Sequence, residues 1–377
     1  MNLRRTRAVA RKELLHIVRD ARSLTMALAV PLLMLLLFGY ALTLDVDRIP
    51  TLIYDEDQTP ESRTLQARLQ GSRYFEILGN VDNYKSIELA IDRGHCLLAV
   101  VIPRHYARKI LAGSVADVQV LVDGSDSNTA AVSLGYAEAL LQAHSMEIRV
   151  LAYNRRASGT LRLPVEGRLR VWYNSEIKSK NYIVPGMIAV ILMIIAALLT
   201  SLTIAREWEM GTMEQLLSTP LRPAELVLGK LAAFFGIGLI DTAVSIGVGV
   251  FLFEVPLRGS LWLLAFTSCI FLFGAMCWGI LLSALTRSQL QAYQMGMLTS
   301  FLPAFMLSGF IYAIENMPVV IQIVTYIFPT RYFVTVLKGI FLKGVGLEIL
   351  WGEIAFLIAF AALVFLLSTQ KLKQKLA

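Results

Sequence analysis

The sequence predicts an α-helical polytopic membrane protein with six transmembrane helices and an α/β extracytoplasmic domain inserted between helices 1 and 2. Composition is the first reason. Of the residues, 56% are hydrophobic and 17% are charged, and the mean hydropathy is +0.61, as in chains with several membrane spans. The other reasons are a set of long apolar stretches and one long polar segment, residues 45–182, in which strand-like and helix-like patterns alternate.

Six stretches are long enough for a helix to cross the bilayer, which needs about 20 apolar residues. Several contain glycine or proline, including Pro31, Gly236 and Pro303, which membrane helices tolerate when neighbouring groups satisfy the freed backbone. The predicted spans are residues 23–44, 183–205, 231–253, 261–286, 292–314 and 349–369.

Basic residues at both ends of the chain predict its orientation. The formal net charge is +7, and basic residues gather in an amphipathic N-terminal tail, residues 1–22, and in the C-terminal tail, residues 370–377. The positive-inside rule places both tails in the cytoplasm, which requires an even number of spans. Residues 317–330 are apolar but too few for a span, so we expect a re-entrant segment within an external loop, residues 315–348. No basic run is interleaved with aromatic residues, so nucleic-acid binding is not expected.

Residues 45–182 have the pattern of a folded α/β domain. His95, Cys96 and His105 lie close together, but their spacing fits no metal-site pattern, so we expect no metal here. A strand-like run at 168–174 leads toward the second span. The predicted strands are 51–55, 74–78, 96–103 and 118–124, and the predicted helices are about 60–70, 83–93, 103–112 and 126–156.

A charged segment, REWEMGTMEQLLSTPLRPAELVLGK at residues 206–230, separates two apolar spans. Trp208 and Leu216 fall near one helical face and the charges lie mostly elsewhere, as in a helix on a membrane surface. Three glutamates suit an anionic lipid surface poorly. Two interpretations stay open: a surface for a cytosolic protein partner, or a solvated connector without a partner. Pro220 and Pro223 are expected to end the helix.

This segment resembles the cytoplasmic segment after the second span of ABC-2 type transporter permeases. The family pattern is approximately (R/K)E(R/W)E.GT.E.L..(T/S)P......(G/C)K, and the matching residues are Arg206, Glu207, Glu209, Gly211, Thr212, Glu214, Leu217, Pro220 and Lys230. Similar features are NYIVPGM at 181–187, FMLSGFIYAIENMP at 305–318 and FPTRYFV at 328–334. The large loop between the first two spans resembles the drug-efflux-like branch of the family.

The resemblance implies that residues 206–230 are a coupling helix, which sits in a groove of a cytosolic ABC ATPase. The coupling residues would be Arg206, Glu207, Trp208, Glu209, Gly211, Thr212, Glu214 and Leu217. The chain has no G-x-x-x-x-G-K-[ST] phosphate loop, so ATP and Mg would be bound by the partner ATPase and this chain would hold no cofactor. The resemblance also implies a second permease chain, identical or paralogous, a periplasmic adaptor protein, and a place in the bacterial inner membrane.

Candidate residues of a substrate path are Asp241, Met297, Phe301 and Phe305. Because an ionisable group near mid-membrane is costly, Asp241 could line the path, bind a cationic substrate or carry a proton. Alternatively, it is protonated or hydrogen-bonded and packs against Ser268 or Thr299. The methionine and phenylalanines could present an adaptable apolar surface to a lipophilic substrate, and ordinary helix packing explains them equally well.

These patterns favour the membrane subunit of an ATP-driven exporter of lipophilic molecules, drugs or lipids. One alternative is a proton- or sodium-driven secondary transporter, for which Asp241 is the main support, although no inverted repeat is visible. Another is a membrane anchor for the external domain, although six spans exceed what anchoring requires. An intramembrane enzyme is disfavoured because all four histidines lie outside the predicted spans.

Overall fold

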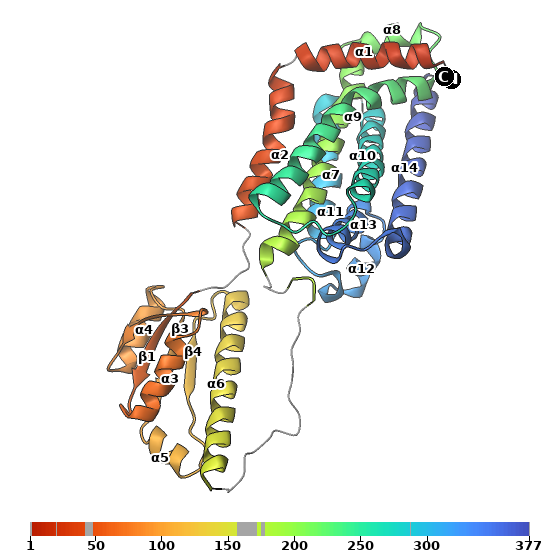
Figure 1. The fold of residues 1–377 in the computed structure, drawn as a ribbon. Helices are drawn as coiled ribbons and strands as arrows, with labels where there is room; N and C mark the ends of the chain where they lie inside the picture. Colours follow the sequence, from red (N-terminus) through yellow and green to blue (C-terminus); the bar gives the residue numbers. More distant parts are fainter. Residues whose placement is uncertain are drawn as a thin grey trace. The chain divides into compact units, whose positions relative to one another are not determined.

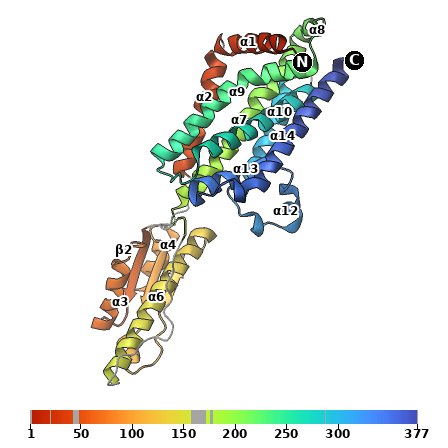
Figure 2. The same cartoon turned by 45° about the vertical axis from the view of Figure 1, so that its right-hand side comes forward.

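The computed structural model describes residues 2–19, 21–41, 48–156, 172–174, 178–286 and 288–376. The chain divides into two compact units, which we describe separately (Figures 1 and 2). The helical unit contains Met1–Thr43 and Arg170–Ala377, and the α/β unit contains Leu44–Leu169. A mostly helical chain with one small sheet agrees with the predicted fold class.

The helical unit is built from long apolar helices and several short ones. In Figure 1, α1 and α8 lie at one end of the long helices, and α12 lies near the other end. The elements are α1 Leu3–Arg19, α2 Ala21–Ala41, α7 Ser179–Glu209, α8 Thr212–Leu217, α9 Pro223–Gly247, η1 Val248–Leu252, α10 Leu261–Leu285, α11 Gln289–Met306, η2 Ile314–Asn316, α12 Val319–Thr325, α13 Pro329–Lys338, η3 Gly339–Lys343 and α14 Leu347–Leu376.

Within the described residues, four helices are long and apolar enough to cross a membrane: Ser179–Glu209, Pro223–Leu252, Leu261–Leu285 and Leu347–Leu372. The pair Val319–Thr325 and Pro329–Lys343 forms a further candidate, which is bent by 84°. In α2 the apolar part is the shorter Leu28–Ala41. The fifth predicted span, 292–314, contains α11, which ends at Met306. The six-span count therefore stays a prediction.

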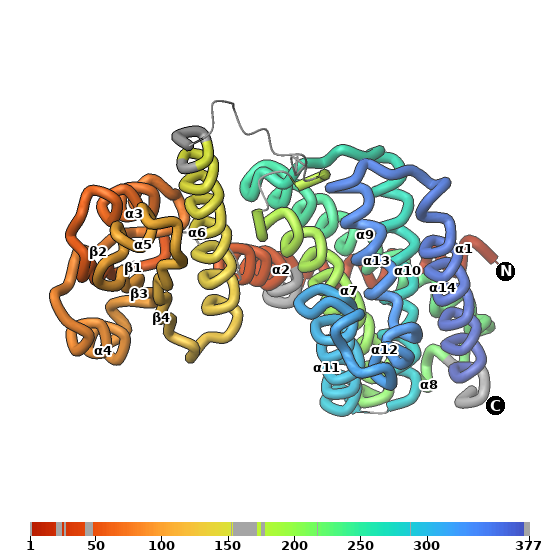
Figure 3. The backbone as a smooth tube through the Cα atoms, turned by 90° about the horizontal axis from the view of Figure 1, so that it is seen from below, coloured from red at the N-terminus to blue at the C-terminus, as the bar shows by residue number. Residues whose placement is uncertain are grey.

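The core of the helical unit forms around α7. Its most apolar stretch has no polar face, and 83% of that stretch is buried inside the unit, as expected for a helix that is hydrophobic all round. Figure 3 shows α7 among the other helices, and it packs most extensively against α10 and α11. Gly279 of α10 has no room for a side chain, because a Cβ there would collide with Thr200 of α7. Small residues at such crossings let membrane helices approach closely.

Residues 317–330, which the sequence predicts as a re-entrant segment, contain α12 and the start of α13. Helix α12 follows Pro318, and the chain turns before α13 begins at Pro329. The second arm, Pro329–Lys343, is not an exposed loop, because Phe333, Leu337 and Phe341 are fully buried. The ring of Phe333 stacks on Phe271 of α10 with the ring centroids 4.0 Å apart. This arm therefore belongs to the core of the helical unit.

The α/β unit has a four-stranded sheet in the order β2-β1-β3-β4. Strand β1 is parallel to β2 and β3, and β4 is antiparallel to β3. The elements overlap the predicted ones: β1 Ile49–Asp55, α3 Pro60–Gln70, β2 Phe75–Asn80, α4 Tyr84–Asp92, β3 Leu98–Ile102, α5 Tyr106–Leu111, β4 Gln119–Val122 and α6 Ser127–Arg156. Of the strand-like run 168–174, residues 168–171 lie outside the described residues, and the described residues 172–174 form no strand.

Two separate apolar clusters give this unit its own core. One cluster contains residues of α3 and α6 together with inward-facing residues of the sheet, such as Leu65 and Ile53. The other cluster contains Ile87 of α4 with Leu52 and Val101 of the sheet. Alternate residues of β1 thus enter different clusters, which is the pattern of a sheet covered on both faces.

Candidate functional site

The charged segment 206–230 is not one helix. Its first residues, through Glu209, form the last turn of α7, and Gly211 then adopts a left-handed conformation with φ of 70°. This conformation favours glycine, and it allows the short α8 to begin at Thr212. Pro220 lies in the following loop, and Pro223 occupies the first turn of α9, a position that proline favours. The predicted helix is thus divided into three pieces by one glycine and two prolines.

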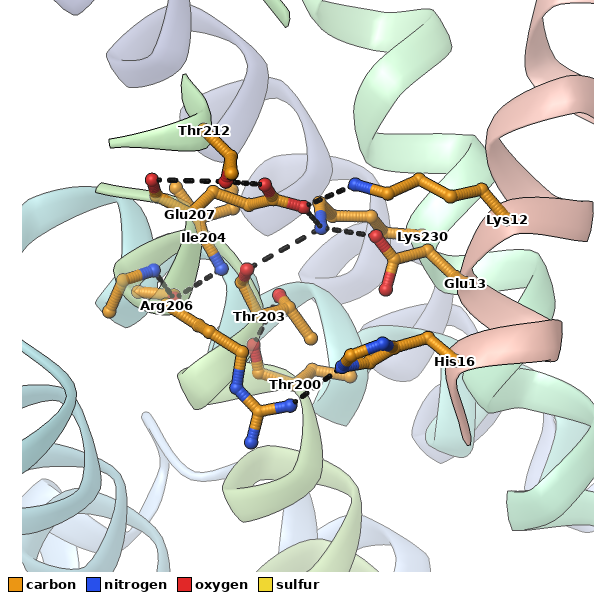
Figure 4. Close-up of polar contacts among 12 residues, drawn as sticks. Lys12, Glu13, His16, Thr200, Thr203, Ile204, Arg206, Glu207, Thr212 and Lys230 are labelled. Atoms are coloured by element: carbon orange, nitrogen blue, oxygen red, sulfur yellow. Dashed lines mark hydrogen bonds and ion pairs between the residues drawn. The ribbon is translucent and has the colours of Figure 1, made fainter. Parts of the chain in front are cut away.

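Lys230 of α9 is the centre of an ion network at this end of the unit (Figure 4). Its Nζ lies 2.6 Å from Oε1 of Glu13 and 3.2 Å from Oε1 of Glu207. The same Nζ donates a longer hydrogen bond, 3.4 Å, to the backbone carbonyl of Thr203. Lys12 of α1 donates to the same Glu207 oxygen at 2.8 Å. Two carboxylates therefore face two ammonium groups, and the network is balanced in charge.

Burial makes this network important for the position of α1. Lys230 is 1% exposed, Glu13 is 7% exposed and Glu207 is 8% exposed. Charged groups removed from water to this extent are stable only when they are paired and hydrogen-bonded. The hydroxyl of Thr212 also donates to the second oxygen of Glu207. The network thus joins four elements: α1, the end of α7, α8 and the first turns of α9.

A close helix crossing supports the same contact. Val9, Glu13 and Ile17 are the buried residues of α1, and their spacing of four places them on one face. Val9 lies over Gly229, where an added Cβ would be only 2.6 Å from the Cβ of Val9. Gly229 therefore admits α1 and the adjacent Lys230 binds it, which gives a physical reason for glycine followed by lysine at this point.

A cavity of about 290 Å³ lies beside the network. One part of its wall is charged and the other is apolar. The cavity leaves room for the charged side chains to rearrange, whereas the close-packed core around α7 leaves none. Its lining includes Lys12, Glu13, His16, Arg206 and Glu207 on the polar side and Ile17, Leu199, Phe234 and Ile237 on the apolar side.

The predicted coupling residues separate into inward-facing and outward-facing groups. Glu207 is buried, Thr212 is half-buried in contact with it, and Trp208 is half-buried against the core. Arg206 is half-buried and donates from its guanidinium to Gln289, at 3.3 Å, and to Nε2 of His16, at 3.2 Å.

The outward-facing group forms a small surface, which we call the α8 surface: Glu209, Met210, Gly211 and Glu214. All four are exposed. Glu209 accepts hydrogen bonds from the backbone and side-chain nitrogens of Gln289. The side chain of Leu217 lies outside the described residues. The acidic character predicted for this segment thus reaches the surface through Glu209 and Glu214, and not through Glu207.

Three of the four candidate substrate-path residues lie on α11, and the fourth, Asp241, lies on α9. Phe301 and Phe305 of α11 stack with ring centroids 5.4 Å apart, and Phe305 also contacts Phe38 and Phe310. Met297 is on the same helix and is 45% exposed. Asp241 lies on α9, which packs mainly against α1, α7 and α10, whereas α11 packs mainly against α7 and α10.

Asp241 forms no hydrogen bond with Ser268 or Thr299 in the described part of the chain. It is 3% exposed, and its Oδ2 has no hydrogen-bond partner in the described part of the chain. The hydroxyl of Ser268 is likewise buried without a partner there, and Thr299 accepts a hydrogen bond from Trp278 instead. Elsewhere, no group of three or more described His, Cys, Asp or Glu residues could hold a metal ion.

Comparison with known proteins identifies the family of this chain. The sequence model of the protein family described as ABC-2 family transporter protein matches residues 22–369 of this chain. The chain is 38% identical over 378 residues to the probable multidrug ABC transporter permease YbhS of Escherichia coli (strain K12), covering 100% of this chain and 98% of that protein. It is 32% identical over 344 residues to the probable multidrug ABC transporter permease YbhR of the same organism, covering 91% of each chain. With the inner membrane transport permease YhhJ it shares 28% identity over 297 residues, or 76% of each chain. This chain therefore belongs to the ABC-2 family of transporter proteins.

Proposed function

We propose that this chain is the membrane permease subunit of an ATP-binding cassette exporter for lipophilic molecules, drugs or lipids, and that a separate cytosolic ABC ATPase drives it. The family match over residues 22–369 carries the proposal. Two relatives that cover more than nine-tenths of the chain are named probable multidrug ABC transporter permeases, which supports the substrate class. The same matches give no support to a proton- or sodium-driven secondary transporter.

In the proposed topology six helices cross the inner membrane, with α2 and α11 as the first and fifth spans. Both basic tails are cytoplasmic, and the α/β unit is on the outer side. The helical unit supports this orientation, because α1, α8 and the C-terminal end of α14 lie at the same end of it (Figure 2). The positive-inside rule then assigns that end to the cytoplasm.

The α8 surface is the proposed contact for the ATPase. Glu209 and Glu214 present exposed carboxylates, and Met210, 62% exposed, adds an apolar, adaptable side chain between them. Such a mixed surface suits a protein groove better than anionic lipid, which would repel the carboxylates. Because α8 is connected to the ion network through Thr212 and Glu207, a displacement of α8 would reach α1, α7 and α9 together.

The proposed path for the substrate follows the aromatic side chains of α11. Phe301, Phe305 and Phe38 form a continuous set of ring contacts between α11 and α2. The exposed Met297 extends this apolar surface toward the proposed second permease chain, identical or paralogous. Asp241 remains a candidate for a cationic substrate group, and unchanged transport by Asp241→Asn would remove it from the path.

The experiment is to purify the chain in detergent with its co-purifying ATPase, identify that ATPase, and place both in inverted vesicles. We expect uptake of a fluorescent lipophilic cation that requires both ATP and the ATPase. Glu214→Lys should abolish ATP-driven uptake and leave membrane insertion intact. Glu348→Lys is the matched control, since it reverses another exposed acidic charge in the same unit. Uptake by the permease without any ATPase would refute the proposal. An adaptor protein on the α/β unit would be sought in the same purification.

A further inference from the structure

The α/β unit contains a groove that the transport proposal does not use. It has a volume of about 680 Å³ and lies between α6 and the segment that runs from α5 into β4. This volume falls in the range of small-molecule sites, roughly 300–1,000 Å³. Its walls are mainly aliphatic and include Ile110, Val115, Val118, Val120, Leu134 and Leu141.

One buried polar side chain lines this apolar groove without a partner. His144 of α6 is 6% exposed, and neither its Nδ1 nor its Nε2 has a hydrogen-bond partner among the residues that the structure describes. Buried polar groups are nearly always hydrogen-bonded, because an unmet donor or acceptor costs free energy. A histidine with two such atoms in the wall of a groove is therefore a reason to expect a ligand, which would reach one of them when the imidazole ring turns toward the groove.

The state of the imidazole limits what that ligand can be. Burial lowers the pKa of His144, and the nearby Arg68 of α3 lowers it further, while Glu147 of α6 opposes them. Arg68 and Glu147 also form an ion pair with each other. At neutral pH the ring is therefore uncharged, with one N–H donor and one acceptor nitrogen. A hydroxyl group can both donate and accept, so it complements either nitrogen, whereas the aliphatic walls exclude a highly charged molecule.

We propose that this groove binds a predominantly apolar molecule that carries a hydroxyl group, with the hydroxyl hydrogen-bonded to His144. The exposed rim, which includes Glu138, Gln142 and Arg149, remains in water. Glu138 and Gln142 already form a hydrogen bond of 3.0 Å with each other at that rim, whereas His144 lies buried in the wall of the groove, which also contains Tyr106. The site belongs to the α/β unit alone and requires neither ATP nor the ATPase.

The test uses the full chain in lipid nanodiscs and a photoactivatable diazirine analogue of 1-dodecanol. Irradiation should attach the probe to peptides from residues 110–120 and 134–148, and excess 1-dodecanol should prevent it. Leu134→Trp should block the groove and reduce labelling at least about fivefold. Leu89→Trp on α4 is the matched control and should leave labelling unchanged, because Leu89 is 44% exposed and Leu134 is 40% exposed.

His144→Phe tests the hydrogen bond itself. It should reduce labelling by the alcohol roughly five- to tenfold, the equivalent of one net hydrogen bond. A diazirine analogue of dodecane, which lacks the hydroxyl, should label weakly and should not distinguish His144→Phe from the unchanged chain. If Leu134→Trp proves unstable, Gln142→Trp at the exposed rim blocks the same groove. The proposal would be overturned if the alcohol and alkane probes labelled the groove equally, or if neither Leu134→Trp nor Gln142→Trp reduced labelling. Because no transport is measured, these outcomes are independent of the transport proposal.

Discussion

Replacement of Lys230 by methionine should release α1 from the rest of the helical unit. Lys230 holds the carboxylates of Glu13 and Glu207 at 2.6 and 3.2 Å, and it is 1% exposed. Methionine keeps a similar volume and removes the charge. The carboxylate of Glu13 then has no cation within salt-bridge distance among the described residues, although it remains buried against α9.

The expected loss follows from the partners that remain. Breaking a buried ion pair by removing one partner costs about 3–5 kcal/mol. We take the lower value, about 3 kcal/mol, because Glu207 keeps Lys12 at 2.8 Å and the hydroxyl of Thr212. At about 1.4 kcal/mol for each factor of ten, the population with α1 detached should rise roughly 150-fold.

Thiol labelling measures this opening. We would place a cysteine at Val9, which is 7% exposed against α9, in a chain whose native cysteines are replaced by alanine, and follow its reaction with a maleimide. Lys230→Met should speed labelling by roughly two orders of magnitude. Lys12→Met is the matched control: it removes the other cation of Glu207, but Lys12 is 54% exposed, so its loss should cost about 1 kcal/mol at most. Labelling at the same rate in the unchanged chain and in Lys230→Met would refute this reasoning.

Three other predictions use the same structure. Gly229→Val should also expose a cysteine at position 9, because a Cβ at Gly229 would lie 2.6 Å from the Cβ of Val9. Gly236→Val on the same helix is the control and should leave that cysteine protected, because a Cβ there has no atom within 4 Å. Glu207→Ala should lower transport and should also lower the free energy of unfolding of the helical unit by about 3 kcal/mol. Glu214→Lys should lower transport alone. A thermal-shift assay run beside the transport assay would show this difference. Burial lowers the pKa of His144 below its ordinary 6.5, so the unfolded chain binds the proton more tightly. The α/β unit should therefore lose stability as the pH falls below about 6.5, and His144→Phe should remove that dependence in chemical unfolding.

Local patterns explain why the α/β unit could be predicted from sequence. Helix α3 was predicted at about 60–70 and occupies Pro60–Gln70. Its start is fixed by residues close in sequence: Thr59 caps the helix by a hydrogen bond with Ser62, and Pro60 occupies the first turn. The strands alternate with such helices, so both their type and their order follow from short-range signals.

The arm at Pro329–Lys343 shows where such signals end. Charged residues at Arg331, Lys338 and Lys343 lower the hydropathy of this region, so the sequence indicates a loop. The structure buries its apolar face against α7 and α14, and it provides partners for two of the charges. Arg331 lies over the ring of Tyr326, and Lys338 donates to the carbonyl of Gly309 at 3.0 Å. Those contacts depend on tertiary structure and have no counterpart in local composition.

The ion network was missed for a similar reason. Glu13 and Lys230 are separated by most of the chain, and the resemblance identified Lys230 only as a matching position. One signal was nevertheless present: Glu13 lies between Val9 and Ile17 at helical spacing, so an acidic residue occupies the apolar face of an otherwise basic helix. A carboxylate in that position requires a buried cation, although its identity could not be read from the sequence.

The same network changes how substitutions in the charged segment must be interpreted. Glu207 and Glu214 belong to one motif, and loss of transport after either change would seem to indicate contact with the ATPase. Glu207 is 8% exposed and paired with Lys230, so its removal leaves a buried ammonium group with one carboxylate instead of two. Transport would then fail because the end of α7 and, through Thr212, α8 are no longer tied to α1 and α9. Glu214 is exposed on α8, and reversal of its charge disturbs no described ion pair. Only a variant that loses transport while the helical unit keeps its stability is evidence for contact with the ATPase, and Glu214→Lys is the variant that can meet this condition.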